Sequence, residues 1–152
     1  MTKNHPHDFL KTQNISGIRA WLDAAGLPNT PPPLALDVNG ELPLSGFDAV
    51  FSANTLHIMS WPEVRHMFLN LSRIVARDFK LAIYGPFNYG GRFTSESNAL
   101  FDASLRNRAP HMGIRDFEAV NALAEASGMG LIADVEMPAN NRTLVWKRAT
   151  VA

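Results

Sequence analysis

The last two apolar runs of the chain restrict its fold more than any other feature. Residues 131–137 and 143–147 both read as strands, and only five residues, 138–142, join them. A crossover between parallel strands needs about a dozen residues or more, so these two strands must form an antiparallel hairpin. Asn140 and Asn141 tolerate the left-handed backbone that a hairpin turn demands.

A strand, a helix and a second strand precede this hairpin in the middle of the chain. Residues 47–53 and 81–84 predict the strands, and Gly85-Pro86 ends the second one. Ser60-Trp61-Pro62-Glu63 has the form of a capping box, and an apolar stripe at helical spacing follows it, which predicts a helix over 61–76. Strands separated by a helix suit a parallel sheet. The sequence therefore predicts an α/β fold with a mostly parallel sheet and a C-terminal antiparallel hairpin.

The other segments carry weaker patterns. Residues 1–13 predict a polar tail, and residues 14–152 predict a single domain. Within that domain we expect a helix from Asn14 to Gly26, a buried strand at 34–38, and helices at 95–106 and 116–127.

Composition excludes several classes of function. The 152 residues include no cysteine, so disulfides, thiolate metal sites and cysteine nucleophiles are ruled out. Fourteen basic residues balance 14 acidic ones, which argues against nucleic acid or an anionic membrane as partner. No apolar run approaches the ~20 residues of a membrane span. We expect a cytoplasmic protein whose partner is a small molecule or another protein.

Polar residues follow each predicted strand, at the sheet edge where α/β proteins bind ligands. Asp37 ends the first strand, Asn54 and His57 follow the second, and Tyr84 and Asn88 stand at the third. A carboxylate, an amide and an imidazole together suit a nucleoside-like ligand. Each has a structural alternative, in which Asp37 caps a turn, Asn54 satisfies backbone at the strand end and His57 packs half-buried.

Other candidate clusters are weaker. The histidines lack metal-ligand spacing, so we expect no metal site, and no serine has the Gly-x-Ser-x-Gly setting of a hydrolase nucleophile. Asn98, Asp102 and Arg106 share one face of a predicted helix. A solvated face is the default interpretation, and a substrate-facing one is the alternative.

From about Ile18 to Arg148 the chain resembles a family of bacterial and eukaryotic proteins, known mainly as a domain of unknown function, that is assigned to the class I S-adenosylmethionine-dependent methyltransferases. The resemblance rests on the strings at 24–29, 32–38, 48–54, 84–87, 97–106 and 137–141, together with Ile58 after His57. It implies a partial Rossmann-like methyltransferase sheet that the terminal hairpin closes.

The resemblance also implies roles for individual residues. Asp37 and Val38 would contact the adenine, and Ser52, Ala53 and Asn54 would lie along the rest of the cofactor, S-adenosylmethionine. His57 is the candidate catalytic base, with Tyr84 beside it. The acceptor pocket would be bordered by Phe87, Asn88, Asn98, Asp102 and Arg106.

The sequence departs from the methyltransferase pattern at its start. This class begins with a strand, a glycine-rich turn and a helix, followed by a second strand that ends in an acidic residue; residues 1–13 contain no glycine and cannot supply them. The expected sheet would then have a gap with unpaired backbone between the strands at 34–38 and 47–53, which a homodimer or a separate N-terminal fragment would complete. The sequence predicts a methyltransferase-like protein of unknown acceptor; the alternative is a truncated, non-catalytic remnant or interaction module that needs a partner chain.

Overall fold

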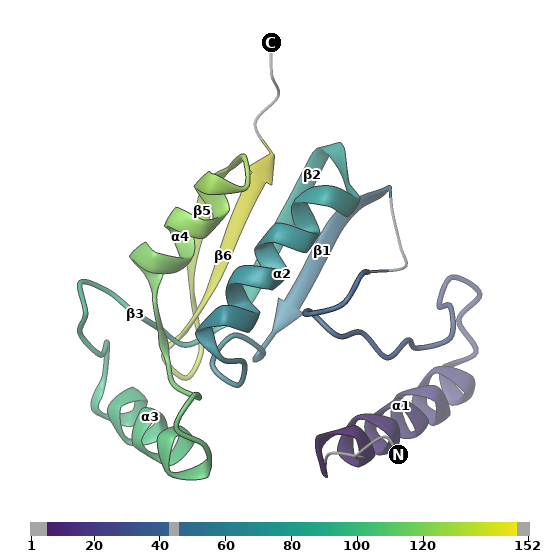
Figure 1. The fold of residues 1–152 in the computed structure, drawn as a ribbon, viewed down its shortest axis with the longest axis horizontal. Coiled ribbons are helices and arrows are strands. Elements are labelled where there is room, and N and C mark those ends of the chain that lie inside the picture. Colours follow the sequence, from purple (N-terminus) through teal and green to yellow (C-terminus); the bar gives the residue numbers. More distant parts are fainter. Residues whose placement is uncertain (1–5, 43–45, 149–152) are drawn as a thin grey trace. The chain divides into compact units, whose positions relative to one another are not determined.

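The computed structural model describes residues 6–42 and 46–148 (Figure 1). The chain forms two compact units: one ends at Asp37, and the other begins at Val38. Each unit is described by itself below.

The N-terminal unit consists of one long helix and an irregular segment. Helix α1 spans Pro6–Ala25, so it begins well before the Asn14 that the sequence predicts. It ends as predicted at Gly26, which has a φ of +60° and donates its N–H to the carbonyl of Leu22 at 3.1 Å. Few other residues adopt that conformation without strain.

The predicted strand at residues 34–38 is wrong. Residues 31–37 are irregular, and the side chains of Leu34 and Leu36 are about half exposed. Three prolines at 31–33 remove backbone N–H donors, and none of the described strand pairings includes this segment.

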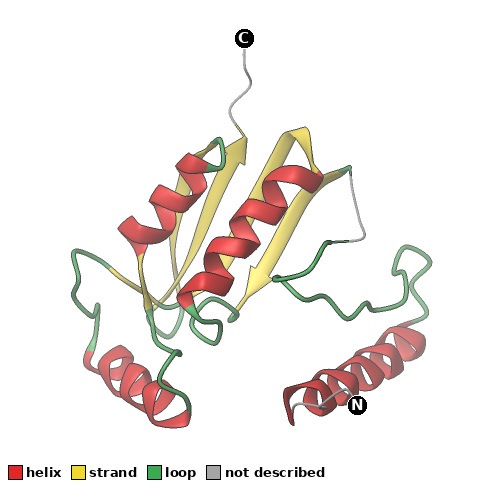
Figure 2. Cartoon of the chain, in the orientation of Figure 1, coloured by secondary structure: helices red, strands yellow, loops and turns green. Residues whose placement is uncertain are grey.

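The second unit is built on a four-stranded sheet with the order β1-β2-β6-β5 (Figure 2). The strands are β1 (Phe47–Ala53), β2 (Val75–Gly85), β5 (Met129–Met137) and β6 (Asn141–Arg148). β1 and β2 pair in parallel, whereas β6 runs antiparallel to both β2 and β5. The predicted hairpin and parallel pair are confirmed, but the sheet is mixed rather than mostly parallel because β6 returns between β2 and β5.

Two helices cover one face of this sheet (Figure 1). Helix α2 (Trp61–Ile74) begins with the predicted capping box, in which Ser60 and Glu63 hydrogen-bond each other's backbone. It ends two residues earlier than predicted because β2 starts at Val75. Helix α4 (Phe117–Ala126) lies beside α2 and packs on β5.

The core fills the space between these helices and the sheet. Val64 and Phe68 of α2, Val120 of α4, and Leu81 and Trp146 of the strands are all fully buried. The indole of Trp146 meets Phe68 edge-on, and its Nε1 donates to Asn121 Oδ1 at 2.9 Å. The core therefore fixes the sheet whose carboxyl edge carries the candidate site.

Smaller elements follow β2 at that edge. β3 (Phe87–Asn88) and β4 (Arg115–Asp116) form a separate two-stranded parallel ladder. Between them runs helix α3 (Glu96–Arg108), whose N-cap is Ser95. Both Phe87 and Asn88 are buried.

Candidate functional site

The carboxyl ends of β1 and β2 bring Asn54, His57 and Gly85 together. Asn54 leaves β1 with a left-handed φ of 56°, and its N–H donates to the carbonyl of Tyr84 at 2.9 Å. A β-carbon placed on Gly85 would lie 3.8 Å from Asn54 Oδ1 and 3.9 Å from His57 Nδ1. Of the polar residues that the sequence predicts at this edge, Asn54 and His57 therefore lie close to each other.

The cofactor-side residues proposed from the sequence divide between the two units. The hydroxyl of Ser52 hydrogen-bonds that of Thr55, and Ala53 is exposed beside Tyr84 in the β1–β2 register. The carbonyl of Val38 accepts from Asn70 Nδ2 of α2 at 2.8 Å. Asp37 is exposed and is the last residue of the N-terminal unit. Contact of Asp37 with an adenine stays a prediction.

His57 is buried, with 6% of its surface exposed, in the turn between β1 and α2. Its ring meets the ring of Phe101 edge-on at 5.3 Å. Burial lowers the pKa of His57 below its ordinary value, and the nearby Arg115 charge lowers it further. The imidazole is therefore neutral at pH 7, which is the form that a proton acceptor requires.

Arg115 holds the turn that carries His57. Its guanidinium donates to the carbonyls of Leu56 at 3.1 Å, of His111 at 2.9 Å and of Met59. The N–H of Gly113 adds a bond to the carbonyl of His57 at 2.9 Å. Sequence reasoning missed Arg115, because a lone arginine between Ile114 and Asp116 carries no pattern that distinguishes it from a surface charge.

The polar face of α3 points inward, so the default interpretation of a solvated face is wrong for two of its three residues. Asn98 and Asp102 are each only 5% exposed. Asp102 accepts the N–H of Ile114 at 2.7 Å and the Nε of Arg106 at 2.7 Å, and Asn98 donates to Thr94 Oγ1 and to the carbonyl of Asn140. These side chains fasten α3 to the segment before β4 and to the hairpin, whereas Arg106 is about half exposed.

Two further predicted residues are Tyr84 and Asn88. Asn141 Nδ2 donates to the hydroxyl of Tyr84 at 3.1 Å, which joins the end of β2 to the hairpin. Asn88 Oδ1 is buried and has no hydrogen-bond partner within residues 6–42 and 46–148. A buried amide oxygen of this kind is uncommon.

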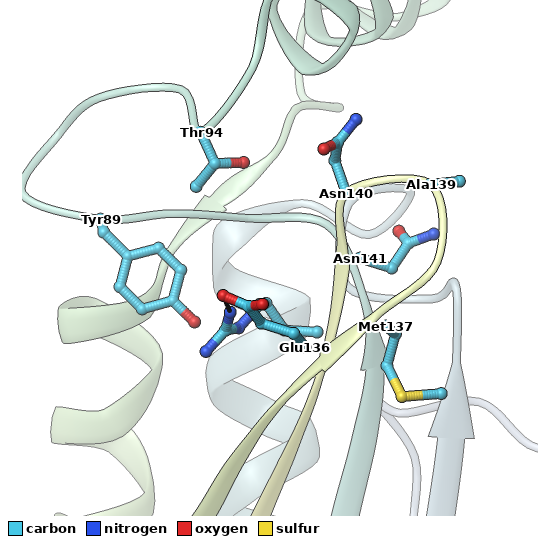
Figure 3. A pocket seen from close by; sticks show the side chains of 8 residues that line it. Tyr89, Thr94, Glu136, Met137, Ala139, Asn140 and Asn141 are labelled. Atoms are coloured by element: carbon cyan, nitrogen blue, oxygen red, sulfur yellow. Dashed lines mark ion pairs between the residues drawn. The ribbon is translucent and has the colours of Figure 1, made fainter.

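A cavity of about 530 Å³ opens at the tip of the β5–β6 hairpin (Figure 3). We call it the hairpin cavity; it is lined by Tyr89, Thr94, Glu136, Met137, Ala139, Asn140, Asn141 and Arg142. Ala139 and Asn140 both have a φ near +60°, as the tight turn requires. Sequence reasoning placed none of these residues in a site.

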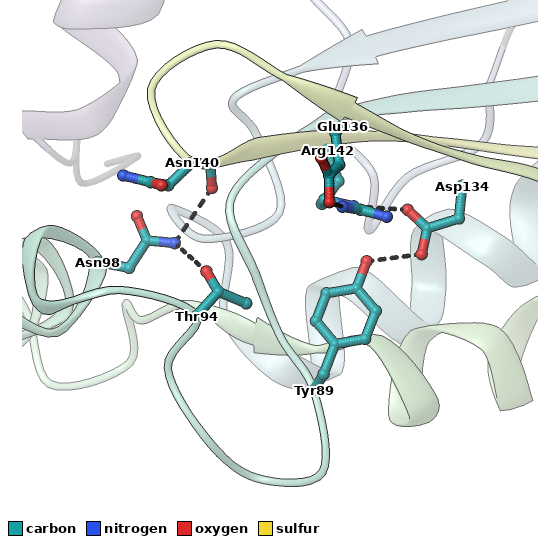
Figure 4. A network of polar contacts seen from close by, with 7 residues as sticks. All are labelled: Tyr89, Thr94, Asn98, Asp134, Glu136, Asn140 and Arg142. Carbon is teal, nitrogen blue, oxygen red and sulfur yellow. Dashed lines mark hydrogen bonds and ion pairs between the residues drawn. The ribbon is translucent and has the colours of Figure 1, made fainter.

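A charged network forms one side of the hairpin cavity (Figure 4). Arg142 Nε lies 2.7 Å from Asp134 Oδ1, and its Nη1 lies 3.0 Å from Glu136 Oε1. The hydroxyl of Tyr89 donates to Asp134 Oδ2 at 2.9 Å. Burial raises the pKa of Tyr89 well above its ordinary value and the Asp134 carboxylate adds to the shift, so the phenol keeps its proton.

Two negative findings concern only the part of the chain that the structure describes. No three histidine, aspartate or glutamate side chains come close enough to hold a metal ion. None of the helices has the length and apolar character needed to span a bilayer.

The resonance of the His57 ring is expected to titrate below pH 6.5. Since the native state then binds its proton less readily than the unfolded chain, the free energy of unfolding should fall as the pH drops below about 6.5 and through the native pKa. An NMR titration of the Cε1 proton checks this, with His57→Gln identifying the signal. Titration at or above 6.5 would contradict the buried, neutral ring.

Comparison with known proteins places the chain in a family. A family model described as "Protein of unknown function (DUF938)" matches residues 5–148. Among solved structures, the mitomycin 7-O-methyltransferase MmcR is 19% identical over 89% of this chain, with a TM-score of 0.76. An O-methyltransferase family protein from Burkholderia thailandensis is 16% identical over 90% of it, with a TM-score of 0.73.

The chain corresponds to only part of these enzymes. It covers 39% of MmcR and 41% of the Burkholderia protein. A third similar structure is CalO1, a methyltransferase in calicheamicin biosynthesis in its SAH-bound form, with 16% identity over 76% of this chain and 34% of CalO1, and a TM-score of 0.62. The chain thus belongs to the DUF938 family and has a methyltransferase-like α/β fold.

Proposed function

We propose that this chain is an S-adenosylmethionine-dependent methyltransferase-like protein that acts on a small molecule. One observation carries the proposal: Asn54 and His57 meet at the carboxyl ends of parallel strands β1 and β2, where α/β sheets bind ligands. They do so in a fold that O-methyltransferases share. Methyl transfer mainly requires placement of the reacting groups, so few catalytic side chains are needed.

The residues at this edge fit one side of the cofactor. Ser52, Ala53 and Asn54 would lie along it, with Asp37 and Val38 toward the adenine, and CalO1 is a neighbour with SAH bound. S-adenosylmethionine supplies the methyl group as a sulfonium. His57 would hold the proton that the acceptor gives up, because its ring is neutral at pH 7. The glycine-rich turn of this enzyme class is absent from residues 1–13, so another segment would have to supply the opposite side.

The second candidate is a non-catalytic interaction module that needs a partner chain. Strand β1 is hydrogen-bonded to β2 only, among the described strands, and Phe51 on it is 67% exposed. An open edge of this kind is a template for another strand. A second copy of this chain or an N-terminal fragment would pair with this edge, and such a partner would have to supply the missing side of the cofactor site.

Replacing Asn54 with glycine is expected to weaken the binding of S-adenosylmethionine and S-adenosylhomocysteine by about 5- to 30-fold, the value of one or two lost hydrogen bonds. Glycine removes the side chain and keeps the left-handed backbone without strain. Calorimetric titration of the purified chain measures the affinity. Asp37→Ala tests the predicted adenine contact in the same way.

Asp48→Ala is the matched control, since Asp48 is exposed on the same strand near its other end. Its affinity should equal that of the unchanged chain. No heat of binding at millimolar ligand by the folded chain would overturn the enzyme proposal for this chain alone. Light scattering on the same samples tests the partner proposal, and a monodisperse monomer would count against a homodimer.

A further inference from the structure

The hairpin cavity lies beside the proposed cofactor edge and is separate from it. Asn141, in its lining, donates to the hydroxyl of Tyr84, and Tyr84 in turn pairs with Ala53 at the end of β1. Three of the residues that the sequence resemblance places around the acceptor pocket, Phe87, Asn88 and Asp102, have buried side chains. The cavity is instead open to solvent and large enough for a small molecule, since such sites measure about 300–1,000 Å³.

Several hydrogen-bond donors around the hairpin cavity are engaged by the protein, among them the hydroxyl of Tyr89 (Figure 4). Asn140 Nδ2 donates to Ser97 Oγ, and Asn141 Nδ2 donates to Tyr84 and to the carbonyl of Pro138. The hydroxyl of Tyr89 donates to Asp134. The side-chain donors of Tyr89, Asn140 and Asn141 are thus at least partly committed to the protein.

Hydrogen-bond acceptors are left over in the same lining. Within residues 6–42 and 46–148, the amide oxygens of Asn140 and Asn141 have no hydrogen-bond partner. The side chain of Glu136 is 89% exposed, and only its Oε1 lies against Arg142. A carboxylate can accept several hydrogen bonds, so Glu136 keeps capacity for a ligand.

The charges of the network favour the same class of ligand. Arg142 lies between two carboxylates, those of Asp134 and Glu136, so the three groups together carry one net negative charge. An anionic ligand would meet this net negative charge, because Nε and Nη1 of the guanidinium already face carboxylates. A cationic donor can approach Glu136 from solvent without breaking either ion pair.

Apolar atoms complete the lining. Met137, Ala139 and Tyr89 all line the cavity, and the ring of Tyr89 stacks on Phe117 at 5.1 Å and lies 5.6 Å from the Arg142 guanidinium. A ring fixed in this way offers a rigid edge against which a ligand body can pack.

We propose that the hairpin cavity binds a small molecule that carries a protonated amine on an apolar or aromatic body. The amine donates to Glu136 and to the amide oxygens of Asn140 and Asn141, and the body packs against Met137 and Tyr89. Binding does not require S-adenosylmethionine. Only the further step, that the bound amine compound is the methyl acceptor, rests on the proposed function.

Three probes of matched shape test this assignment: tyramine, which is cationic, 4-ethylphenol, which is neutral, and 4-hydroxyphenylacetate, which is anionic. Amide chemical shifts of the ¹⁵N-labelled full chain report where each one binds. Tyramine should shift residues 89–94 and 136–142 and bind most tightly, and Glu136→Gln should weaken it about three- to tenfold, as expected for one partly screened charge. The three probes should bind Glu136→Gln with similar affinities.

Glu125→Gln is the control, because Glu125 is exposed on α4 near the opposite end of β5. It should bind tyramine as the unchanged chain does. Equal or tighter binding of the anionic probe, or no shifts at residues 136–142 with millimolar tyramine, would overturn the assignment. S-adenosylmethionine should shift residues 52–57 in both glutamate variants, so failure of the cofactor site and failure of the hairpin cavity give different results.

Discussion

Replacing Arg115 with leucine is expected to lower the free energy of unfolding by about 3–5 kcal/mol. The reason is that three backbone carbonyls lose the hydrogen bonds that the half-buried guanidinium donates to them. Those carbonyls belong to Leu56, Met59 and His111, and they have no second donor from a side chain in the described residues. The turn from Leu56 to Met59 carries His57, so its backbone amides should also shift in NMR spectra. Urea denaturation followed by circular dichroism measures the loss.

Two variants separate this effect from the loss of a charge. Arg115→Lys keeps the charge and one donor group, and should recover part of the stability because an ammonium cannot reach all three carbonyls at once. Arg65→Leu removes an exposed arginine of α2 and should change stability by less than about 0.5 kcal/mol. A loss below about 1 kcal/mol for Arg115→Leu would show that the turn holds itself without this residue.

Trp146→Ala should cost a similar amount, about 3–5 kcal/mol, for a different reason. The indole is fully buried near the end of β6, so its removal leaves a cavity beneath α2 and α4 and leaves Asn121 Oδ1 without its donor. Trp146→Phe retains much of the volume and should cost less. The midpoint of urea unfolding, measured by circular dichroism, ranks the three proteins.

Trp21→Ala is the matched control for this experiment. Trp21 is 81% exposed on α1, so the same truncation there should leave the free energy of unfolding within about 0.5 kcal/mol of the unchanged chain. Equal losses for Trp146→Ala and Trp21→Ala would contradict the core described above.

Sequence alone was sufficient where the physical cause is local. The capping box sets the start of α2 because Ser60 and Glu63 are three residues apart in the chain. The five-residue connection excludes a parallel crossover, and the hairpin is antiparallel as predicted. β1 has the bounds that its apolar pattern predicts, and its polar end places Asn54 and His57 at the carboxyl edge.

Tertiary structure decided whatever depends on residues that are distant in the chain. Residues 34–37 are as apolar as a strand, but a strand needs a hydrogen-bonded neighbour, and the segment after the prolines has none among the described residues. Asn98 and Asp102 look like a solvated face until the hairpin and the N–H of Ile114 supply their partners. Arg115 and the hairpin cavity have no sequence pattern, because their contacts join segments that only the folded sheet brings together. The elements follow from local chemistry, whereas the direction in which their polar side chains point follows from packing.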